Sequence, residues 1–388
     1  MSSYTGANAL NGFSPECLID LQSYFKQTGE CFHDHKSAYL HFKEYGQAAG
    51  LNPSPFFYTA WYIWQNPDVS AYATVLDHFV HRGLEAVVDP APFLDGIIFL
   101  NAHTEYSNIV EALDALTQGR DRALSPCLED HLRLLAERQT SVHQAVRASY
   151  ICRQPTGRRR LVWVQAGPRF NVTRWFCPTE PRSWDLMCNW YTRDGLDLRH
   201  GEIHLSQTGT KPTGIHHVLQ NDPGLFQNYD QLLFLDDDLT IAHKDIDRLF
   251  DIAEHDGLDL FQGALLSGSH GAWPDLFQKG SSRTRQVTGV EIMMPGFTRA
   301  ALFSCAALFA RNISGYGLDF MFSEQIRRAG GRCGVIDAVG VRHEAPIDER
   351  GGAYYRQLRA LGINYKLELY AAIHELGKFP SFREIPNG

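Results

Sequence analysis

Apolar runs and helix-like segments alternate along the second half of the chain. Five runs have the length of buried strands, and they span residues 161–164, 185–191, 231–235, 259–266 and 333–341. Helical patterns lie between them, at residues 244–257, 298–311 and 318–331 among others. Such alternation is typical of a mostly parallel sheet covered by helices, in which ligands bind at the carboxyl ends of the strands. We therefore predict an α/β domain over residues 158–346.

The front of the chain carries a repeat. Residues 41–57 (HFKEYGQAAGLNPSPFF) and 78–94 (HFVHRGLEAVVDPAPFL) align without gaps. Each unit reads as a short helix ending at glycine, followed by a proline-rich turn. Trp61 and Trp64 lie between the units, where packing is the ordinary role of aromatic residues and carbohydrate contact is the alternative. We predict a small, mainly helical repeat domain over residues 1–100, a helical connector over 101–157 and a C-terminal helical extension over 347–388.

Composition narrows the class of protein. The chain has 388 residues, 44% of them hydrophobic, which is enough for a sizeable core. Its net charge of -8 gives no general attraction for nucleic acid. The eight cysteines form no CxxC pair, so we expect reduced thiols. No export signal opens the sequence, and the longest nearly apolar run, residues 300–310, is too short to span a bilayer. We expect a cytoplasmic protein without a nucleic-acid partner or an integral membrane segment.

Three consecutive aspartates follow the apolar run at 231–235. Carboxylates packed this closely repel one another and resist desolvation, so a plain surface turn requires that all three face water. In an extended segment Asp236 and Asp238 point the same way, while Asp237 points opposite. A pair of carboxylates with this spacing can hold Mg²⁺ or Mn²⁺, which in turn clamps a diphosphate. A metal site is thus the functional interpretation, and a solvated turn is the alternative.

Two enzyme classes place such a D-x-D after an apolar strand. Haloacid-dehalogenase-like phosphatases use D-x-D-x-T, which Asp236, Asp238 and Thr240 satisfy, and phosphorylate the first aspartate. That motif opens their catalytic domain, whereas α/β pattern precedes it here, and Asp337 alone stands where a late aspartate pair is needed. Nucleotide-sugar transferases of the GT-A fold have D-x-D in mid-domain. The placement favours the transferase.

Several ordered motifs resemble a glycosyltransferase-like family of bacteria and plants long catalogued as a domain of unknown function. They are YDQLLFLDDDL (229–239), VTGVEIMMPGFTRAAL (287–302) and SGYGLDFMFSEQIRRAGGRCGVIDAVGVRHEAP (314–346). The front segment FYTAWYIWQNPDV (57–69) looks like repeats attached to bacterial polysaccharide-synthesis glycosyltransferases. The resemblance implies a GT-A-like fold and a metal-dependent glycosyltransferase, which moves a sugar from a nucleotide-sugar donor to a carbohydrate or glycoconjugate acceptor. Bacterial surface polysaccharide or glycoconjugate synthesis is the implied setting.

The resemblance also implies roles for single residues. Asp236, Asp238 and His343 would hold the metal, with Mn²⁺ favoured over Mg²⁺ because an imidazole suits it better. Asp319 would be the base that takes the acceptor proton, which implies inversion. A helix-start carboxylate is the alternative for Asp319, and a structural strand-end histidine is the alternative for His343.

Two further sets of residues complete the expected site. Surface charge is the alternative for the arginines among them, and packing is the alternative for the tryptophan. The donor is expected near Gln165, Ala166, Gly167, Lys211, Asp237, Arg283 and Arg285, and the acceptor near His270, Trp273 and Glu291. A phosphatase using Asp236, or a non-catalytic carbohydrate-binding or scaffold protein on a transferase fold, remains the alternative function. The sequence predicts neither the donor, the acceptor nor the oligomeric state.

Overall fold

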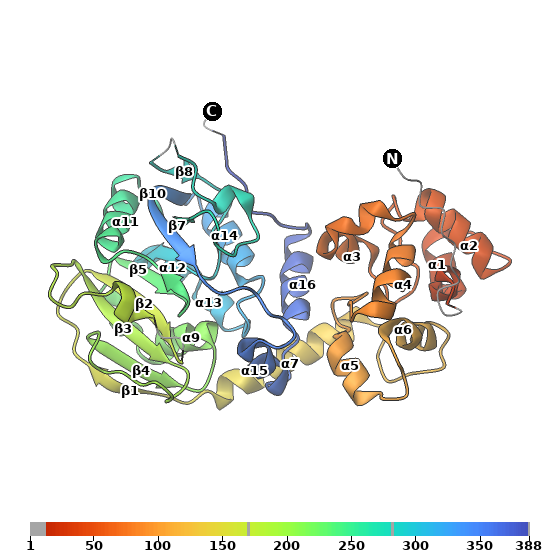
Figure 1. Ribbon diagram of the computed structural model, residues 1–388, viewed down its shortest axis with the longest axis horizontal. Helices are drawn as coiled ribbons and strands as arrows, with labels where there is room; N and C mark the ends of the chain where they lie inside the picture. The colour runs from red at the N-terminus through yellow and green to blue at the C-terminus, as the bar shows by residue number, and fades with distance from the viewer. Residues whose placement is uncertain (1–12, 169–170, 281–282, 387–388) are drawn as a thin grey trace. The chain divides into compact units, whose positions relative to one another are not determined.

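The computed structural model describes residues 13–168, 171–280 and 283–386 (Figure 1). The chain divides into two compact units, Met1–Leu134 and Leu135–Gly388. Helix α7 (Leu128–Ala145) spans the division between them. The finer boundaries predicted at residues 100, 157 and 346 stay predictions. Within the described part of the chain, none of the helices combines the length and the apolar character that crossing a bilayer requires.

The first unit is built from short helices. Several begin at a residue whose side chain accepts a backbone N–H of the first turn, as Asp20, Asp34 and Thr74 do. Such caps satisfy amides that have no partner within the helix. The helices of this unit are α1 (Leu21–Thr28), α2 (His35–His41), α3 (Thr59–Gln65), α4 (Val75–Glu85), α5 (Gly96–Ala102) and α6 (Ile109–Thr117).

A tyrosine–histidine pair recurs in this unit with nearly the spacing of the sequence repeat. The hydroxyl of Tyr24 lies 2.8 Å from Nδ1 of His41, and the hydroxyl of Tyr62 lies 2.8 Å from Nδ1 of His78. Both tyrosines are fully buried, so each hydroxyl needs such a partner. Trp61, between the repeat units, is 1% exposed, which fits packing.

The second unit is a mixed sheet flanked by helices (Figure 1). Its strand order is β1-β4-β3-β2-β5-β9-β7-β10-β6, with β8 on β10. Strands β4, β3, β2 and β5 run parallel to one another, as do β7 and β10. The predicted α/β class, with a mostly parallel sheet flanked by helices, is confirmed. The strands are β1 (Ala148–Arg153), β2 (Arg160–Ala166), β3 (Trp184–Trp190), β4 (Ile203–Gln207), β5 (Gln231–Leu235), β6 (Leu239–Thr240), β7 (Leu260–Leu265), β8 (Arg285–Gln286), β9 (Gly296–Thr298) and β10 (Cys333–His343).

The structure of this unit follows the predicted alternation, with two differences. The segment predicted as a single helix at 298–311 forms two shorter helices that meet at Cys305. Residues 148–153, within the predicted helical connector, form β1. The helices are α8 (Val172–Trp175), α9 (Lys211–Asn221), α10 (Pro223–Gln227), α11 (His243–His255), α12 (Arg299–Ser304), α13 (Ala306–Phe309), α14 (Leu318–Arg328), α15 (Ala353–Ala360) and α16 (Tyr365–Leu376).

Strand register sets the position of the aspartates. All residues of β3 and β5 are buried, as expected for central strands covered on both faces. Val164 of β2 lies opposite Leu235 of β5, and Ala166 lies opposite Trp190 of β3. The residues after β2, β3 and β5 therefore emerge at one edge of the sheet. The aspartates at 236–238 lie at this edge, where parallel sheets bind ligands.

Candidate active site

Asp236 forms an ion pair with a buried lysine. Lys211, at the start of α9, donates from Nζ to Oδ1 of Asp236 at 2.6 Å and to the carbonyl of Met293 at 3.1 Å. Burial, reinforced by the charge of Asp238 and opposed by Lys211, raises the pKa of Asp236 to about 6. The side chain keeps 34% exposure, so solvent moderates this shift. Lys211, predicted to bind the donor diphosphate, thus neutralises the first aspartate.

Asp238 faces the histidine that ends β10. Nε2 of His343 lies 3.4 Å from Oδ1 of Asp238. Nδ1 of His343 lies 2.5 Å from the carbonyl of His270, and because a carbonyl only accepts, Nδ1 carries a hydrogen. Burial lowers the pKa of His343, but the hydrogen bond and charge of Asp238 outweigh it and raise the pKa to about 9. Pairing of β6 with the end of β10 holds the two residues together.

Asp237 is tied to the end of β3. It is buried, and its Oδ2 accepts a hydrogen bond of 2.5 Å from the Tyr191 hydroxyl. The Tyr191 ring covers Gly167, where a Cβ would lie 2.1 Å from the ring. Glycine is therefore required at 167 for this arrangement. Gln165 and Ala166, also predicted near the donor, are buried in the sheet, and Oε1 of Gln165 accepts from Trp163 and Asn189.

Asp319 lies in the first turn of α14 and is 8% exposed. Its Oδ1 accepts from the amide of Phe320 at 3.0 Å, and its Oδ2 accepts from the amide of Ile292 at 3.4 Å. Burial raises the pKa of Asp319 to about 7, against the opposing effect of these amides. The helix N-terminus also favours negative charge here. Asp319 is thus a buried carboxyl group whose pKa lies near neutral pH.

Glu291 is a second buried carboxyl beside Asp319. It is 6% exposed, and its amide donates to Oε1 of Gln262 at 2.8 Å. Within the described residues, its Oε2 has no hydrogen-bond partner. Burial and then the charge of Asp319 raise the pKa of Glu291 to about 8, while His343 and the amide of Ala272 oppose the shift. Glu291 and Asp319 are therefore two carboxyl groups with raised pKa values that are close enough for their charges to interact.

The segment 291–293 joins the two halves of this cluster. Glu291 interacts with Asp319 and His343, and the amide of Ile292 binds Asp319. The carbonyl of Met293 accepts from Lys211 and from the amide of Asp236. Sequence reasoning missed this role of Met293, because a carbonyl leaves no signature in residue type. It also missed Tyr191 and Gln262, which orient members of the cluster.

The donor set suits a divalent cation. Asp238 offers carboxylate oxygen and His343 offers Nε2, with Nδ1 held by a carbonyl as is usual for metal-binding histidines. Asp236 could join only if Lys211 moved away. Among the residues that the structure describes, the three-residue group with possible ligand atoms within 4.8 Å of one another is instead His103, Glu105 and Asp121 in the first unit. There, Nδ1 of His103 lies 3.2 Å from Glu105 and 3.8 Å from Asp121.

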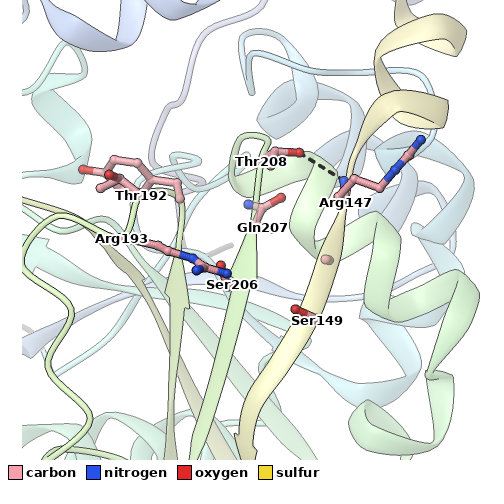
Figure 2. Close-up of a pocket in the computed structure, with 9 residues that line it drawn as sticks. Arg147, Ser149, Thr192, Arg193, Ser206, Gln207 and Thr208 are labelled. Carbon is pink, nitrogen blue, oxygen red and sulfur yellow. Dashed lines mark hydrogen bonds between the residues drawn. The ribbon is translucent and has the colours of Figure 1, made fainter.

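A cavity of about 410 Å³ opens at the same edge of the sheet, beyond β2 (Figure 2). The side chains drawn in Figure 2 come from the ends of β3 and β4 and from the start of β1. Tyr191 lines the cavity and also binds Asp237, so it connects the cavity to the aspartates. Adjacent strands lie about 4.8 Å apart, so β3 and β5 are separated by roughly 10 Å. The lining is Arg147, Ala148, Ser149, Tyr191, Thr192, Arg193, Ser206, Gln207 and Thr208.

The two arginines predicted near the donor lie elsewhere. Arg285 is buried and binds both carboxylate oxygens of Asp337, at 2.6 and 3.0 Å. It pairs with Val335 on β10. Because β10 bulges between Ile336 and Gly340, Val335 and His343 are separated by about five strand residues, or roughly 17 Å along the sheet. Arg283 is exposed and lies 4.0 Å from Asp256. The cluster around Asp238 therefore includes neither arginine. Arg285 instead neutralises Asp337, a buried aspartate of the sheet.

The residues predicted to lie near the acceptor are found beside Asp319 and His343. His270 takes part through its carbonyl, which binds His343. Trp273 packs edge-on against Phe320, with ring centroids 5.7 Å apart, and against Phe382 at 5.4 Å. Phe320 is the neighbour of Asp319 in the chain. Trp273 therefore has a packing role, and its contact with an acceptor stays a prediction.

Comparison with known proteins gives little beyond this geometry. No family model and no curated protein matches the chain. A crystal structure of GalNAc-T7 with UDP, GalNAc and Mn²⁺ is similar to 55% of this chain and 50% of its own, with 13% identity and a TM-score of 0.32. The structure of A197 from STIV is similar to 50% of this chain and 87% of its own, with 16% identity and a TM-score of 0.28. The chain thus spans half the length of GalNAc-T7, and likeness at this level does not bear on what the site does.

Proposed function

We propose that the second unit is a GT-A-like, metal-dependent glycosyltransferase. It would move a sugar from a nucleotide-sugar donor to a hydroxyl group of a carbohydrate or glycoconjugate acceptor. The observation that carries this proposal is one cluster at the carboxyl edge of the sheet. In it, a carboxylate–imidazole pair suited to a cation, Asp238 and His343, lies beside two buried carboxyls, Glu291 and Asp319. By the resemblance of its motifs, the protein acts in the cytoplasm in bacterial surface polysaccharide or glycoconjugate synthesis.

Donor binding would use both the cation site and the cavity. Asp238 and His343 would hold Mn²⁺ or Mg²⁺, which supplies neutralisation of negative charge on a diphosphate. The cavity beyond β2 offers hydroxyl, amide and guanidinium groups to the nucleoside, with Tyr191 linking it to Asp237. The separation of roughly 10 Å between β3 and β5 suits a nucleoside and its phosphates lying across the end of β2.

The chain's own groups would handle protons. Lys211 keeps Asp236 ionised and holds the carbonyl of Met293, which fixes the segment that bears Glu291. A buried carboxylate takes the proton of the acceptor hydroxyl as that oxygen attacks the anomeric carbon. One displacement assisted by one base inverts the configuration at that carbon. Asp319 was predicted as the base, and Glu291 is a second carboxyl within reach of the same chemistry.

A thermal-shift panel tests the proposal. UDP, GDP and CMP are each added with and without Mn²⁺, and sugar-nucleotide hydrolysis is then assayed for any hit. We expect one nucleotide to stabilise the protein only with Mn²⁺, by about 2.7 kcal/mol at a hundred times its Kd. Asp238→Asn should abolish this stabilisation, whereas Asp251→Asn, on an aspartate with 66% side-chain exposure, should retain it.

Two outcomes would contradict the proposal. If no nucleotide raises the melting temperature with Mn²⁺, a non-catalytic carbohydrate-binding or scaffold protein is favoured. If Asp236 becomes phosphorylated and is trapped by a fluoride analogue, the protein is a phosphatase. The ion pair with Lys211 is the observation that favours this second candidate, because an ammonium beside a carboxylate nucleophile would also attract a phosphate.

A further inference from the structure

We infer that Glu291, rather than Asp319, accepts the proton of the acceptor hydroxyl, and that Asp319 is a positioning residue. The inference rests on the proposed function, because it concerns the transfer at the same site. It assigns to Glu291 a catalytic role instead of the acceptor-binding role predicted from sequence, and it moves the base from α14 to the segment that follows β8.

Glu291 has an unsatisfied carboxylate oxygen. Oε2 has no hydrogen-bond partner among the residues that the structure describes, and it is buried, since Glu291 is only 6% exposed. Leaving a buried polar atom unpaired costs about 1–3 kcal/mol. Other buried side-chain atoms of the described residues also lack a hydrogen bond, but Oε2 of Glu291 is the carboxylate oxygen among them. A ligand or solvent can complete the bonding of such an atom. A hydroxyl group of a bound acceptor is a donor that would satisfy Oε2.

Asp319, in contrast, is already hydrogen-bonded through both carboxylate oxygens. Each of its two oxygens accepts a backbone amide, from Phe320 and from Ile292. Amides that bind a carboxylate stabilise its charged form and make it a weaker proton acceptor. The bond to Ile292 also fixes the residue next to Glu291. Asp319 therefore acts on the reaction through Glu291, which it holds in place and whose proton affinity it increases by its negative charge.

The segment that carries Glu291 is held by hydrogen bonds on both sides. On one side, the amide of Glu291 is bound by Gln262 of β7. On the other side, the carbonyl of Met293 binds Lys211 and the amide of Asp236. The carboxyl is thus carried between two central strands, close enough to His343 for the two charges to interact. A base fixed in this way needs no rearrangement to meet a bound substrate.

The step balances in atoms and electrons. The O–H bond of the acceptor breaks, and its proton moves to Oε2 of Glu291. The acceptor oxygen forms a bond to the anomeric carbon of the donor sugar. The bond from that carbon to the diphosphate oxygen breaks, and its electron pair leaves with the nucleoside diphosphate. The configuration at the anomeric carbon is inverted.

The test compares variants of the full-length chain at these two positions. Hydrolysis of the sugar nucleotide identified by the panel is measured with water as the acceptor, and binding is measured as the thermal shift with that nucleotide and Mn²⁺. We expect Glu291→Gln to lower the hydrolysis rate by about 100-fold to 10,000-fold and to keep the thermal shift, because base catalysis contributes that much. We expect a smaller loss of rate in Asp319→Asn. Glu375→Gln, on an exposed glutamate, is the matched control.

Chemical rescue separates a base from a structural carboxyl. Added formate should restore part of the rate of Glu291→Ala, because it refills the vacated carboxylate position, and should not restore that of Asp319→Ala. Glu291→Asp retracts the carboxyl by one methylene, should keep the fold and should also lose most of the rate.

The inference is overturned if Glu291→Gln or Glu291→Asp keeps a rate close to that of the unaltered protein, or if formate rescues Asp319→Ala alone. Failure of the proposed function looks different. In that case, the unaltered protein shows no nucleotide-dependent shift and no hydrolysis.

Discussion

Glu291 and Asp319 are two acidic side chains buried beside each other, and one of them lacks a partner for an oxygen. A fold selected for stability alone would neutralise or expose such groups, as it does for Asp337 with Arg285. Burial of both carboxyls opposes their ionisation, so the apoprotein is less stable at neutral pH than it would be with neutral side chains. Preorganised functional sites commonly lower the stability of the folded protein in this way.

The pH dependence of stability tests this view of Glu291. Its pKa is raised to about 8 in the folded protein, above an unfolded value near 4.3, so the folded state holds the proton more tightly. The free energy of unfolding therefore falls as pH rises between these values. Glu291→Gln cannot ionise and should be more stable than the unaltered protein at pH 8, by roughly 1–3 kcal/mol, with no gain near pH 4. Urea unfolding at several pH values measures it, and a gain independent of pH would contradict it.

Gly167 offers a second test at the scale of one residue. A Cβ at this position would lie 2.1 Å from the Tyr191 ring, so Gly167→Ala should push Tyr191 away from Asp237. Overpacking of this kind costs about 1–3 kcal/mol. We also expect weaker nucleotide binding, measured as a smaller thermal shift with Mn²⁺. Gly280→Ala is the matched control, since no atom lies within 4 Å of its added Cβ. Equal behaviour of the two variants would remove Tyr191 from the site.

Functional groups of side chains could be predicted from the sequence, because residue type shows them. The roles of backbone groups, such as the carbonyl of Met293, could not. The aspartates at 236–238 were found because three charges follow a buried strand. The resemblance placed His343 beside Asp238, but the partners of Asp236 and Asp237 were not foreseen, because Lys211 and Tyr191 come from other parts of the chain. Arg285 was misplaced for a related reason. Its cationic side chain suits a phosphate and a buried aspartate equally well, and only the pairing of β8 with β10 decides between them.

At the scale of elements, prediction succeeded where burial is complete. Strands β3, β5 and β7 are buried at every residue and appear in the sequence as apolar runs. Strand β1 alternates between half-buried and exposed residues, and β9 has three residues, so neither forms such a run. Gly296 in β9 lies where a Cβ would meet the Phe261 ring at 2.3 Å. Close strand packing of this kind leaves only a glycine as its signal.

The role of the C-terminal tail, residues 377–386, was not predicted from the sequence. It runs beside β8 (Figure 1), where the amide of Ile385 donates to the carbonyl of Gln286 and Arg383 and Thr288 exchange hydrogen bonds. Phe382 of this tail is buried against Trp273 and Phe320. The tail therefore packs against the aromatic side chains next to Asp319.

Phe382→Ala tests this packing. Phe382 is 3% exposed, and truncating a buried phenylalanine costs about 3–5 kcal/mol. We expect that loss in guanidinium unfolding, together with greater solvent exposure of Trp273. Tryptophan fluorescence quenching, read against Trp273→Phe, reports the second effect. Phe379→Ala removes a ring of the same tail that is 38% exposed and should cost less than 1 kcal/mol. If both variants lose equally little, this packing of the tail does not stabilise the protein.

At the scale of the whole molecule, the two units carry different kinds of structure. In the second unit, three carboxyl groups with raised pKa values, Asp236, Glu291 and Asp319, lie in one cluster at the carboxyl ends of the strands. In the first unit, the buried hydroxyls of Tyr24 and Tyr62 bind His41 and His78 in a repeated way. We place the proposed catalysis in the second unit, and we expect the repeats to be stabilised independently of it. Their relation to carbohydrate stays a prediction.

Hydrogen exchange resolved along the chain tests that separation. Tyr62→Phe removes the hydroxyl that binds Nδ1 of His78, and the buried imidazole left without it should lower protection in residues 13–134 by about 1–3 kcal/mol. Residues beyond 134 should keep their protection, and the nucleotide with Mn²⁺ should raise protection there in both the variant and the unaltered protein. Tyr45→Phe, on a tyrosine that is 63% exposed, should change neither region. Loss of nucleotide-induced protection in Tyr62→Phe would show that the repeats contribute to the site, because a separate module cannot alter binding in its neighbour.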